Sequence, residues 1–599
     1  MIPKLPVACI SAIAISSSLY AQELPPPIER PKVDAHGIEL QSGRYGGLNV
    51  PIVSIGTGPA ALVRKYGSQD GREVIVVPIF TVHSSPPQVI MNNVNYDVYT
   101  YQYPGGNEKF RTVPGSGLYE PEFTTGSTLE YSDGELVFTD KYGVKIIGNT
   151  IIFPDGRKVR GGGRRSGVDP YFFGIFETSN NFGFRIRLSR SGDTYLAQAV
   201  NMAIDYCDEE QTSPCSNLTE VRAGTEYRPT RDEVILTNAV GETTRILLEA
   251  IEAYDSEPDC IYRCDGTRWA HYYPTEIYYP NSIVPDVSLT YRGSDSAHTV
   301  SHSEIILDTL QVSGMEIQNS GEVLRYAAGG SQPTGFQVYA APFVNGVQLV
   351  GAWSTNVGGS AWPASNLEMQ YIKDANGAET RFSYNALGEI SEIRFAGGGR
   401  LEHLYDERFN VTKIIRHPDV SSGDEPLVTT FEYPDFCTPA TQTTCNLPKV
   451  VIDPNGNTSE YTYNDRGQLL TATGPAPTAN AARPTTRNEY TERTAYILDG
   501  NGGLEPAGPP ISLLTRTSQC LTSENCEGTA DEVVTEYDYG PVPGPGVPVY
   551  ATNLLLRGVA VTAADESGQL QTLRTCYAYN YFGERVSETS PRADLEVCP

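Results

Sequence analysis

Residues 384–390 read YNALGEI, and the same pattern returns as YNDRGQL at residues 463–469 and as YNYFGERV at residues 579–586. These three stretches form an internal repeat, in which one small structural unit is used several times along the chain. A repeat of this kind indicates an architecture more directly than it indicates an activity.

The second copy has the pattern of a β-hairpin. Tyr461 and Tyr463 fall on one face of a strand, because side chains alternate with a period of two. Residues 464–467 supply a turn, since Asn bonds to its own backbone and Gly accepts the positive φ that closes a hairpin with a bulge. Residues 468–473 return as the second strand. A single hairpin is marginally stable, so each copy must pair with its neighbours.

An acidic turn with glycine precedes each copy, as DANG (374–377), DPNG (453–456) and DESG (565–568). Seven residues separate this glycine from the repeat tyrosine in the first two copies and eleven in the third, which therefore carries an insertion. NAVGETT (238–244) is a further lead with Asn in place of Asp, and FPDGR (153–157) is a worn hairpin turn. The hairpin pattern thus extends beyond the C-terminal part.

A degenerate copy, YDERFNV, begins at Tyr405, 21 residues after Tyr384. Phe409 occupies its glycine slot, where a bulky residue at positive φ costs about 1–2 kcal/mol. We therefore predict a different geometry for this turn. The predicted motif residues are Asp374, Gly377, Tyr384, Gly388, Tyr405, Asp453, Gly456, Tyr463, Gly467, Asp565, Gly568, Tyr579 and Gly583.

The period, the Asp-x-x-Gly lead and the Tyr-[Asn/Asp]-x-x-Gly core resemble the rearrangement-hot-spot repeat, also called the Rhs or YD (tyrosine-aspartate) repeat. The resemblance covers about the last 230 residues of the chain. It implies an all-β fold in which antiparallel hairpins form a spiralling sheet or partial hollow shell. In bacterial Rhs toxins and insecticidal toxin complexes such a shell encloses a toxin, and in animal teneurins a related barrel serves adhesion.

The composition suits strands and turns. Tyr (37) outnumbers Phe (18), and Gly and Pro contribute 57 and 43 of the 599 residues. The formal net charge of −28 disfavours binding to a phosphate backbone, so no nucleic-acid partner is expected. Colloidal solubility is the plainer explanation of this charge.

The N-terminus has the pattern of a secretory signal peptide, with Lys4 before a short apolar stretch and Ala21 at a plausible cleavage position. The predicted organisation is a signal peptide (1–21), a Pro-rich linker (22–34), an N-terminal β domain that leads into the repeats (35–200), a β-rich middle region with cysteine-closed loops (201–370) and the repeat region (371–599). No other stretch approaches the 18 apolar residues of a membrane span. We expect a secreted or cell-surface protein, with the periplasm as an alternative.

Ten of the eleven cysteines follow the predicted signal peptide, and eight of those lie in close pairs. Short spacings with polar or proline residues between them are typical of disulfides in an oxidising compartment. A zinc site needs paired Cys-x-x-Cys sets, which the sequence lacks. From proximity alone, the predicted pairs are Cys207 with Cys215, Cys260 with Cys264, Cys437 with Cys445, Cys520 with Cys526, and Cys576 with Cys598.

The sequence offers no clear catalytic constellation. His298 and His302 lie four apart without the Glu of a His-Glu-x-x-His motif, and no Gly-x-Ser-x-Gly elbow or phosphate-binding loop occurs. Asp499 and Glu505 stand in a turn-rich cluster whose oxygens could hold calcium, but the full loop signature is absent and an ordinary turn is the favoured explanation. We therefore expect no enzyme activity, no metal and no cofactor.

The expected function is that of an exported, non-catalytic Rhs/YD-repeat structural and interaction protein, working in a toxin-encapsulating or contact-dependent surface system. The alternative is a secreted adhesin-like module that binds carbohydrate or protein through exposed tyrosines. The repeats are few, so the last strand should leave an unpaired sheet edge. We expect either a protein partner at that C-terminal edge or continuation in a longer chain.

Overall fold

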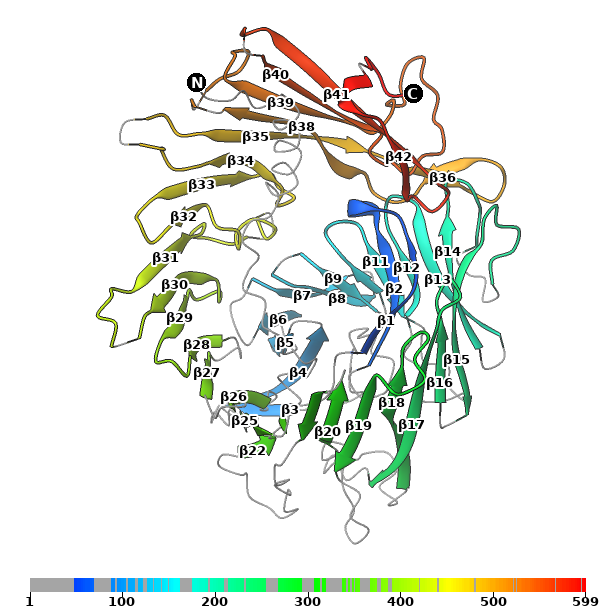
Figure 1. The fold of residues 1–599 in the computed structure, drawn as a ribbon, viewed down its shortest axis with the longest axis vertical. Helices are drawn as coiled ribbons and strands as arrows, with labels where there is room; N and C mark the ends of the chain where they lie inside the picture. The colour runs from blue at the N-terminus through cyan, green and yellow to red at the C-terminus, as the bar shows by residue number, and fades with distance from the viewer. Residues whose placement is uncertain are drawn as a thin grey trace.

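The computed structural model consists of antiparallel β-strands with two short 3-10 helices among the described residues, η1 (Gly58–Ala60) and η3 (Pro591–Ala593) (Figure 1). The predicted all-β class is confirmed, and the large sheets are not closed into barrels. The structure describes residues 48–68, 88–91, 94–103, 106–113, 117–121, 126–132, 134–141, 143–148, 150–161, 175–191, 194–208, 214–230, 233–254, 268–292, 306–312, 315–318, 337–340, 343–344, 347–348, 351–355, 367–373, 379–385, 390–419, 421–438, 441–478, 481–520, 522–523, 525–565, 567–593 and 595–599.

The chain begins its described part with two small sheets. The first is the hairpin of β1 (Leu48–Ile55) and β2 (Leu62–Ser68). The second has four strands, β3 (Gln88–Met91), β4 (Val94–Tyr103), β5 (Gly106–Val113) and β6 (Leu118–Pro121).

A sheet of fifteen strands follows, and its strands neighbour one another in sequence order. They are β7 (Thr128–Ser132), β8 (Glu135–Thr139), β9 (Lys145–Ile147), β10 (Thr150–Ile152), β11 (Lys158–Gly161), β12 (Ile175–Ser179), β13 (Phe184–Ser191), β14 (Thr194–Asn201), β15 (Arg222–Thr230), β16 (Glu233–Thr237), β17 (Thr243–Tyr254), β18 (Arg268–Tyr278), β19 (Val287–Arg292), β20 (Ile306–Val312) and β21 (Met315–Gln318).

The second large sheet has seventeen strands. They are β22 (Gln337–Ala340), β25 (Gly351–Thr355), β26 (Leu367–Lys373), β27 (Glu379–Tyr384), β28 (Ile390–Arg394), β29 (Arg400–Tyr405), β30 (Val411–His417), β31 (Leu427–Glu432), β32 (Val450–Ile452), β33 (Thr458–Tyr463), β34 (Leu469–Thr473), β35 (Thr485–Arg493), β38 (Ile511–Cys520), β39 (Glu532–Asp538), β40 (Gly558–Ala564), β41 (Leu570–Tyr579) and β42 (Arg585–Glu588). Two two-stranded hairpins branch from it, β23 (Phe343–Val344) with β24 (Val347–Gln348), and β36 (Tyr496–Leu498) with β37 (Leu504–Pro506).

The two large sheets follow one another around a ring, and the last strands return to the side of the ring where β13 and β14 lie (Figure 1). The predicted boundaries at 200/201 and 370/371 fall inside these sheets, at the end of β14 and within β26. The division into domains stays a prediction. The predicted signal peptide and linker lie outside the described residues.

The main core lies where the β1–β2 hairpin packs across β13 to β16. Ile52, Phe184 and Leu236 are buried there, and the main-chain N–H of Ala239 donates to the carbonyl of Ile52 at 3.0 Å. The same cluster includes Leu513 and Phe582 from the far end of the chain. One core thus joins the first and last described elements.

Many of the described hairpin turns share one geometry. In the turn at 453–457, the N–H of Asp453 donates to the carbonyl of Asn457 and the N–H of Gly456 donates to the carbonyl of Asp453, both at 2.9 Å. The Asp453 carboxylate accepts the N–H groups of Asn455 and Asn457, each at 2.8 Å, and Gly456 has φ 82°. An Asx turn followed by a residue in the left-handed region explains why Asp or Asn stands first and Gly fourth. The same two main-chain bonds form at 140–144, 180–184, 238–242, 406–410, 464–468, 565–569 and 580–584.

The prediction for the degenerate turn is wrong. Phe409 takes φ 60°, and its N–H donates to the carbonyl of Asp406 at 3.0 Å, as Gly does in the other turns. The Asp406 carboxylate accepts the N–H groups of Arg408 and Asn410, at 2.9 and 2.8 Å. These capping bonds hold the turn although the fourth residue is not glycine.

Candidate functional site

The repeat tyrosines connect neighbouring hairpins through their hydroxyl groups. The hydroxyl of Tyr405, at the end of β29, donates to the carbonyl of Ile390, the first residue of β28, at 2.6 Å. Ile390 adjoins a bulge in the pairing of β27 with β28, and a bulge disturbs the ladder that would otherwise use that carbonyl. The tyrosine of one hairpin therefore completes the hydrogen bonding of the previous one.

Four other tyrosines make the same kind of bond, each to a carbonyl at or just before the start of the preceding strand. They are Tyr433 to Val411 at 3.0 Å, Tyr463 to Pro448 at 2.9 Å, Tyr490 to Leu469 at 3.0 Å and Tyr579 to Leu556 at 2.7 Å. The repeat pattern did not identify Tyr433 and Tyr490. Their signal is a tyrosine at or near a strand end without the Asn/Asp-x-x-Gly turn.

The other predicted motif residues fall in the turns where they are described. Asp565 caps its turn as Asp453 does, and hydrogen bonds from Ser567 and Gln569 lower its pKa to about 2. Gly467, Gly568 and Gly583 have φ of 79°, 81° and 72°. Tyr384 ends β27, while Asp374, Gly377 and Gly388 lie outside the described residues.

The structure contains four of the predicted disulfides, which join Cys207 to Cys215, Cys437 to Cys445, Cys520 to Cys526 and Cys576 to Cys598. Cys260 and Cys264 lie outside the described part of the chain. Buried side chains hold the first disulfide loop. The guanidinium of Arg185 donates to the carbonyl of Cys207 at 2.8 Å, and the Gln198 amide bonds both main-chain groups of Cys215.

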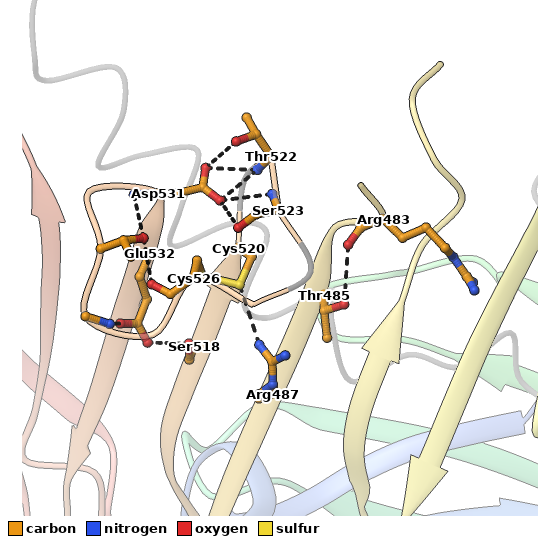
Figure 2. The surroundings of a disulfide bond; sticks show 12 residues. Arg483, Thr485, Arg487, Ser518, Cys520, Thr522, Ser523, Cys526, Asp531 and Glu532 are labelled. Atoms are coloured by element: carbon orange, nitrogen blue, oxygen red, sulfur yellow. Dashed lines mark hydrogen bonds between the residues drawn. A yellow bond between two sulfur atoms is a disulfide. The ribbon is translucent and has the colours of Figure 1, made fainter. Parts of the chain in front are cut away.

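Figure 2 shows how polar side chains brace the loop closed by Cys520 and Cys526. The carboxylate of Asp531 accepts the hydroxyl groups of Thr522 and Ser523, each at 2.7 Å. Burial alone would raise the pKa of Glu532, but hydrogen bonds from the Ser518 hydroxyl and the Gly528 N–H lower it. Both carboxylates therefore serve to hold the loop.

The ring closes where the last hairpin, residues 577–588, meets the first strands; we call this segment the closing hairpin. The N–H of Gly56 donates to the carbonyl of Phe582 at 2.7 Å, and the Thr57 hydroxyl donates to the carbonyl of Gly583 at 3.0 Å. Tyr581 and Phe582 are each 6% exposed. A Cβ added at Gly583 would lie 2.7 Å from the ring of Phe184, so only glycine fits this approach.

Charged and polar groups reinforce the closing hairpin. Arg222 pairs with both carboxylate oxygens of Glu584, and its guanidinium lies 3.8 Å from the centre of the Phe582 ring. The bond from Arg222 lowers the pKa of Glu584 to about 2. The hydroxyl of Tyr581 donates to Asp205 at 2.5 Å, and burial followed by this bond raises the pKa of Tyr581.

The sequence contained one signal for this contact. The first two motif copies place Ala-Leu and Asp-Arg between Asn and Gly, whereas the third places Tyr581 and Phe582 there. Two aromatic side chains in a hairpin turn need a surface to cover them. The receiving residues, Arg222 and Asp205, carry no such local signal.

The closing hairpin is followed by a tail that returns over β40 and β41. The N–H of Thr589 donates to the carbonyl of Cys576 at 2.9 Å, and the Arg557 guanidinium donates to the carbonyl of Pro599 at 2.5 Å. Within the described part of the chain, no strand pairs with the outer edge of β42. The predicted partner at this edge stays a proposal.

A second junction forms where the loop closed by Cys437 and Cys445 reaches the start of the fifteen-stranded sheet. The Gln442 amide donates to the carbonyls of Gly126 and Asp140, at 2.9 and 3.1 Å. The Asn446 amide donates to the carbonyl of Lys141 at 3.0 Å. The repeat strands and the N-terminal strands are thus joined at two separate places.

A pocket of about 720 Å³ opens beside this second junction, and we call it the junction pocket. Pro121 and residues 126–128 line it from the N-terminal strands, and residues 406–408, Thr412, residues 431–438 and Gln442 line it from the repeat strands. Phe431 and Tyr433 are half-buried in its lining, and Phe436 is 82% exposed. Its charged lining residues are Asp406, Glu407, Arg408, Glu432 and Asp435.

The possible metal ligands in the sequence include two histidines that the structure does not describe and one aspartate that caps a turn. His298 and His302 lie outside the described residues. The carboxylate of Asp499 accepts the N–H groups of Asn501 and Gly503, each at 2.8 Å, in an Asx turn. Among the described residues, no group of three or more His, Cys, Asp or Glu side chains could hold a metal ion. In that same part of the chain, no helix is long and apolar enough to cross a bilayer.

No protein-family model and no curated protein matches the chain. Among solved structures, it is similar to TcdB2-TccC3 (TM-score 0.19, 11% identity, 80% of this chain and 27% of that chain) and to TcdB2-TccC3-TEV (TM-score 0.18, 8% identity, 83% and 33%). A third similar structure is the Photorhabdus luminescens Tc holotoxin pore (TM-score 0.15, 10% identity, 92% and 34%). The chain spans about a third of the length of these chains, and similarity at such TM-scores carries no argument about function.

Proposed function

We propose that the chain is an exported, non-catalytic structural and interaction protein of the Rhs/YD-repeat type, working with a partner protein in a toxin-encapsulating or contact-dependent surface system. The observation that carries this proposal is the closed ring. The closing hairpin docks on the first strands with Tyr581 and Phe582 buried. Two large sheets that follow one another around a ring, with the last hairpin docked on the first strands, are suited to enclosing or presenting another polypeptide.

The disulfides support the exported part of the proposal. Four bonds close loops of six to 22 residues in sequence separation, and such bonds persist in oxidising compartments. In the part of the chain that the structure describes, every carboxyl group whose pKa is clearly displaced is displaced downward, among them Asp453, Asp565 and Glu584. These groups stay ionised at neutral pH and hold turns and contacts, which suits a structural role better than proton donation.

The experiment isolates the native protein from periplasmic and extracellular fractions without reductant and weighs it by native mass spectrometry. We expect the oxidised chain in these fractions, in a complex heavier than a single copy of the chain without residues 1–21. Reduced protein found only in the cytoplasm would overturn the exported role. Turnover of a substrate by the purified protein would overturn the non-catalytic role.

The second candidate function is a secreted adhesin-like module that binds carbohydrate or protein. The exposed Phe436 beside the junction pocket favours it, because exposed aromatic rings are common in binding surfaces. In that case the same isolation should give a free monomer that binds cell envelopes in a saturable way. A heavier complex without envelope binding would exclude this candidate.

A further inference from the structure

The junction pocket has an excess of negative charge. Its lining holds four carboxylates, Asp406, Glu407, Glu432 and Asp435, against one guanidinium, Arg408. That guanidinium is already engaged, since it donates to the carbonyl of Pro434 at 2.6 Å and lies 3.6 Å from Asp406. Among the described residues, Glu432 and Asp435 take part in no ion pair. The pocket therefore presents unneutralised carboxylates to solvent.

Aromatic rings stand beside these carboxylates. Tyr433 is fixed, because its hydroxyl donates to the carbonyl of Val411 at 3.0 Å. Phe436 is 82% exposed and adjoins Cys437, whose disulfide to Cys445 ties the wall of the pocket to the loop that docks on Gly126. Rings held beside carboxylates suit a cation that also carries an apolar stem, since the ring face and the carboxylate both attract it.

We propose that the junction pocket binds a short basic polypeptide segment of a partner protein, with lysine or arginine side chains beside apolar ones. Charge complementarity selects this occupant over a neutral sugar, which gains nothing from an excess of carboxylates. The net charge of −28 on the whole chain strengthens the long-range attraction. The inference rests on the proposed function in taking the chain for an interaction protein, and it names the chemistry of the partner.

The test measures fluorescence anisotropy of a fluorescein-labelled peptide, Gly-Lys-Leu-Lys-Leu-Lys-Gly, titrated with the full-length oxidised protein. We expect one saturable site that weakens as salt is raised and does not bind the peptide with Glu in place of Lys. The double variant Glu432→Gln/Asp435→Asn should weaken binding about fivefold, and Phe436→Ser about threefold.

Matched controls change exposed residues of the same types away from the pocket. Asp424→Asn/Glu425→Gln and Phe395→Ser should bind the basic peptide as the wild type does, because these residues are exposed outside its lining. The double variant Glu432→Lys/Asp435→Lys should gain binding to the Glu peptide. This gain of function cannot arise from misfolding.

Three results would overturn the proposal. The first is the absence of saturable binding, and the second is equal weakening in pocket and control variants. The third is displacement of the basic peptide by chitohexaose, a sugar without net charge. The first two leave the heavier native complex unaffected, so the proposed function can stand while the pocket inference fails. Loss of that complex with intact peptide binding would mark the opposite case.

Discussion

Phe409 holds a backbone conformation that side chains with a Cβ rarely adopt, at φ 60°. Asp406 maintains it by accepting two main-chain N–H groups, and the carbonyl of Phe409 also receives Lys141 at 3.4 Å. We expect Phe409→Gly to be about 1 kcal/mol more stable than Phe409→Ala, because both variants lose the ring but only glycine relieves the strain. Urea denaturation of the two variants measures the difference, and equal stability would show that the turn stores no strain.

Glu584 gives the closing hairpin a pH dependence. The bond from Arg222 lowers its pKa from 4.5 to about 2, so its contribution to stability is present above pH 4.5 and is lost as pH falls towards 2. Glu584→Gln should remove this part of the acid sensitivity, as followed by acid unfolding through tyrosine fluorescence. Glu425→Gln, at an exposed position outside the contact, serves as the control and should unfold as the wild type does. An unchanged acid profile for Glu584→Gln would contradict the assignment.

For single residues, the sequence predicted which residue types stand in the turns, but not which distant residues they contact. The Asp and Gly positions at 453, 456, 565 and 568 follow from turn chemistry, which is local, and the structure places them in turns of the expected kind. The error at Phe409 arose because capping by Asp406 outweighs the cost of positive φ. The pairing of Arg222 with Glu584 depends on residues 362 apart, and no local rule reaches that far.

In the repeat strands, the tyrosine hydroxyl of one hairpin donates to a carbonyl at the start of the preceding strand. Tyr463→Phe removes the donor to the carbonyl of Pro448 and should cost about 1–2 kcal/mol, since a partly buried carbonyl then lacks its partner. Tyr461→Phe is the matched control, because the hydroxyl of Tyr461 makes no hydrogen bond within the described chain. Chemical denaturation of both variants is the measurement. Equal loss in the two would show that ring packing, not the hydroxyl, joins the hairpins.

The hairpins themselves were predictable, because alternation and turn residues act within about ten positions. The bond from one hairpin's tyrosine to a carbonyl at the start of the preceding strand was not predictable, since it depends on which carbonyl the strand ladder leaves open. Tyr433 and Tyr490 make this bond without the full motif around them. The position of these tyrosines on their strands, rather than the repeat motif around them, determines whether they make this bond.

The whole molecule depends on the contact between its two ends. Phe582→Ala should remove a buried ring from the main core and cost about 3–5 kcal/mol there. We expect the amide hydrogen of Gly56 to lose its protection from exchange, since its acceptor is the carbonyl of Phe582. Phe436→Ala, at an 82% exposed position, should leave that protection intact. Unchanged protection of the Gly56 amide in Phe582→Ala would mean that closure of the ring of sheets does not depend on the Phe582 side chain.

The closed ring was the feature that the sequence predicted least. The motif count predicted few repeats and an open end. It could not include β7 to β21, because these strands match the repeat motif poorly or not at all. The return of the last hairpin to β1 follows from the curvature summed over two large sheets. Small twists between neighbouring strands set that sum, and no short pattern records them.

The distance along the chain between the two halves of the closing contact has a consequence for biosynthesis. Thr57 is synthesised long before its hydrogen-bond partner Gly583, which lies 526 residues later in the chain. At a synthesis rate of about 5–20 residues per second, roughly half a minute to two minutes pass between the appearance of the two. During that interval the apolar surface around Phe184 has no cover from the C-terminal aromatic residues. A nascent chain of this design needs a chaperone or a partner to shield its beginning until its end has been made.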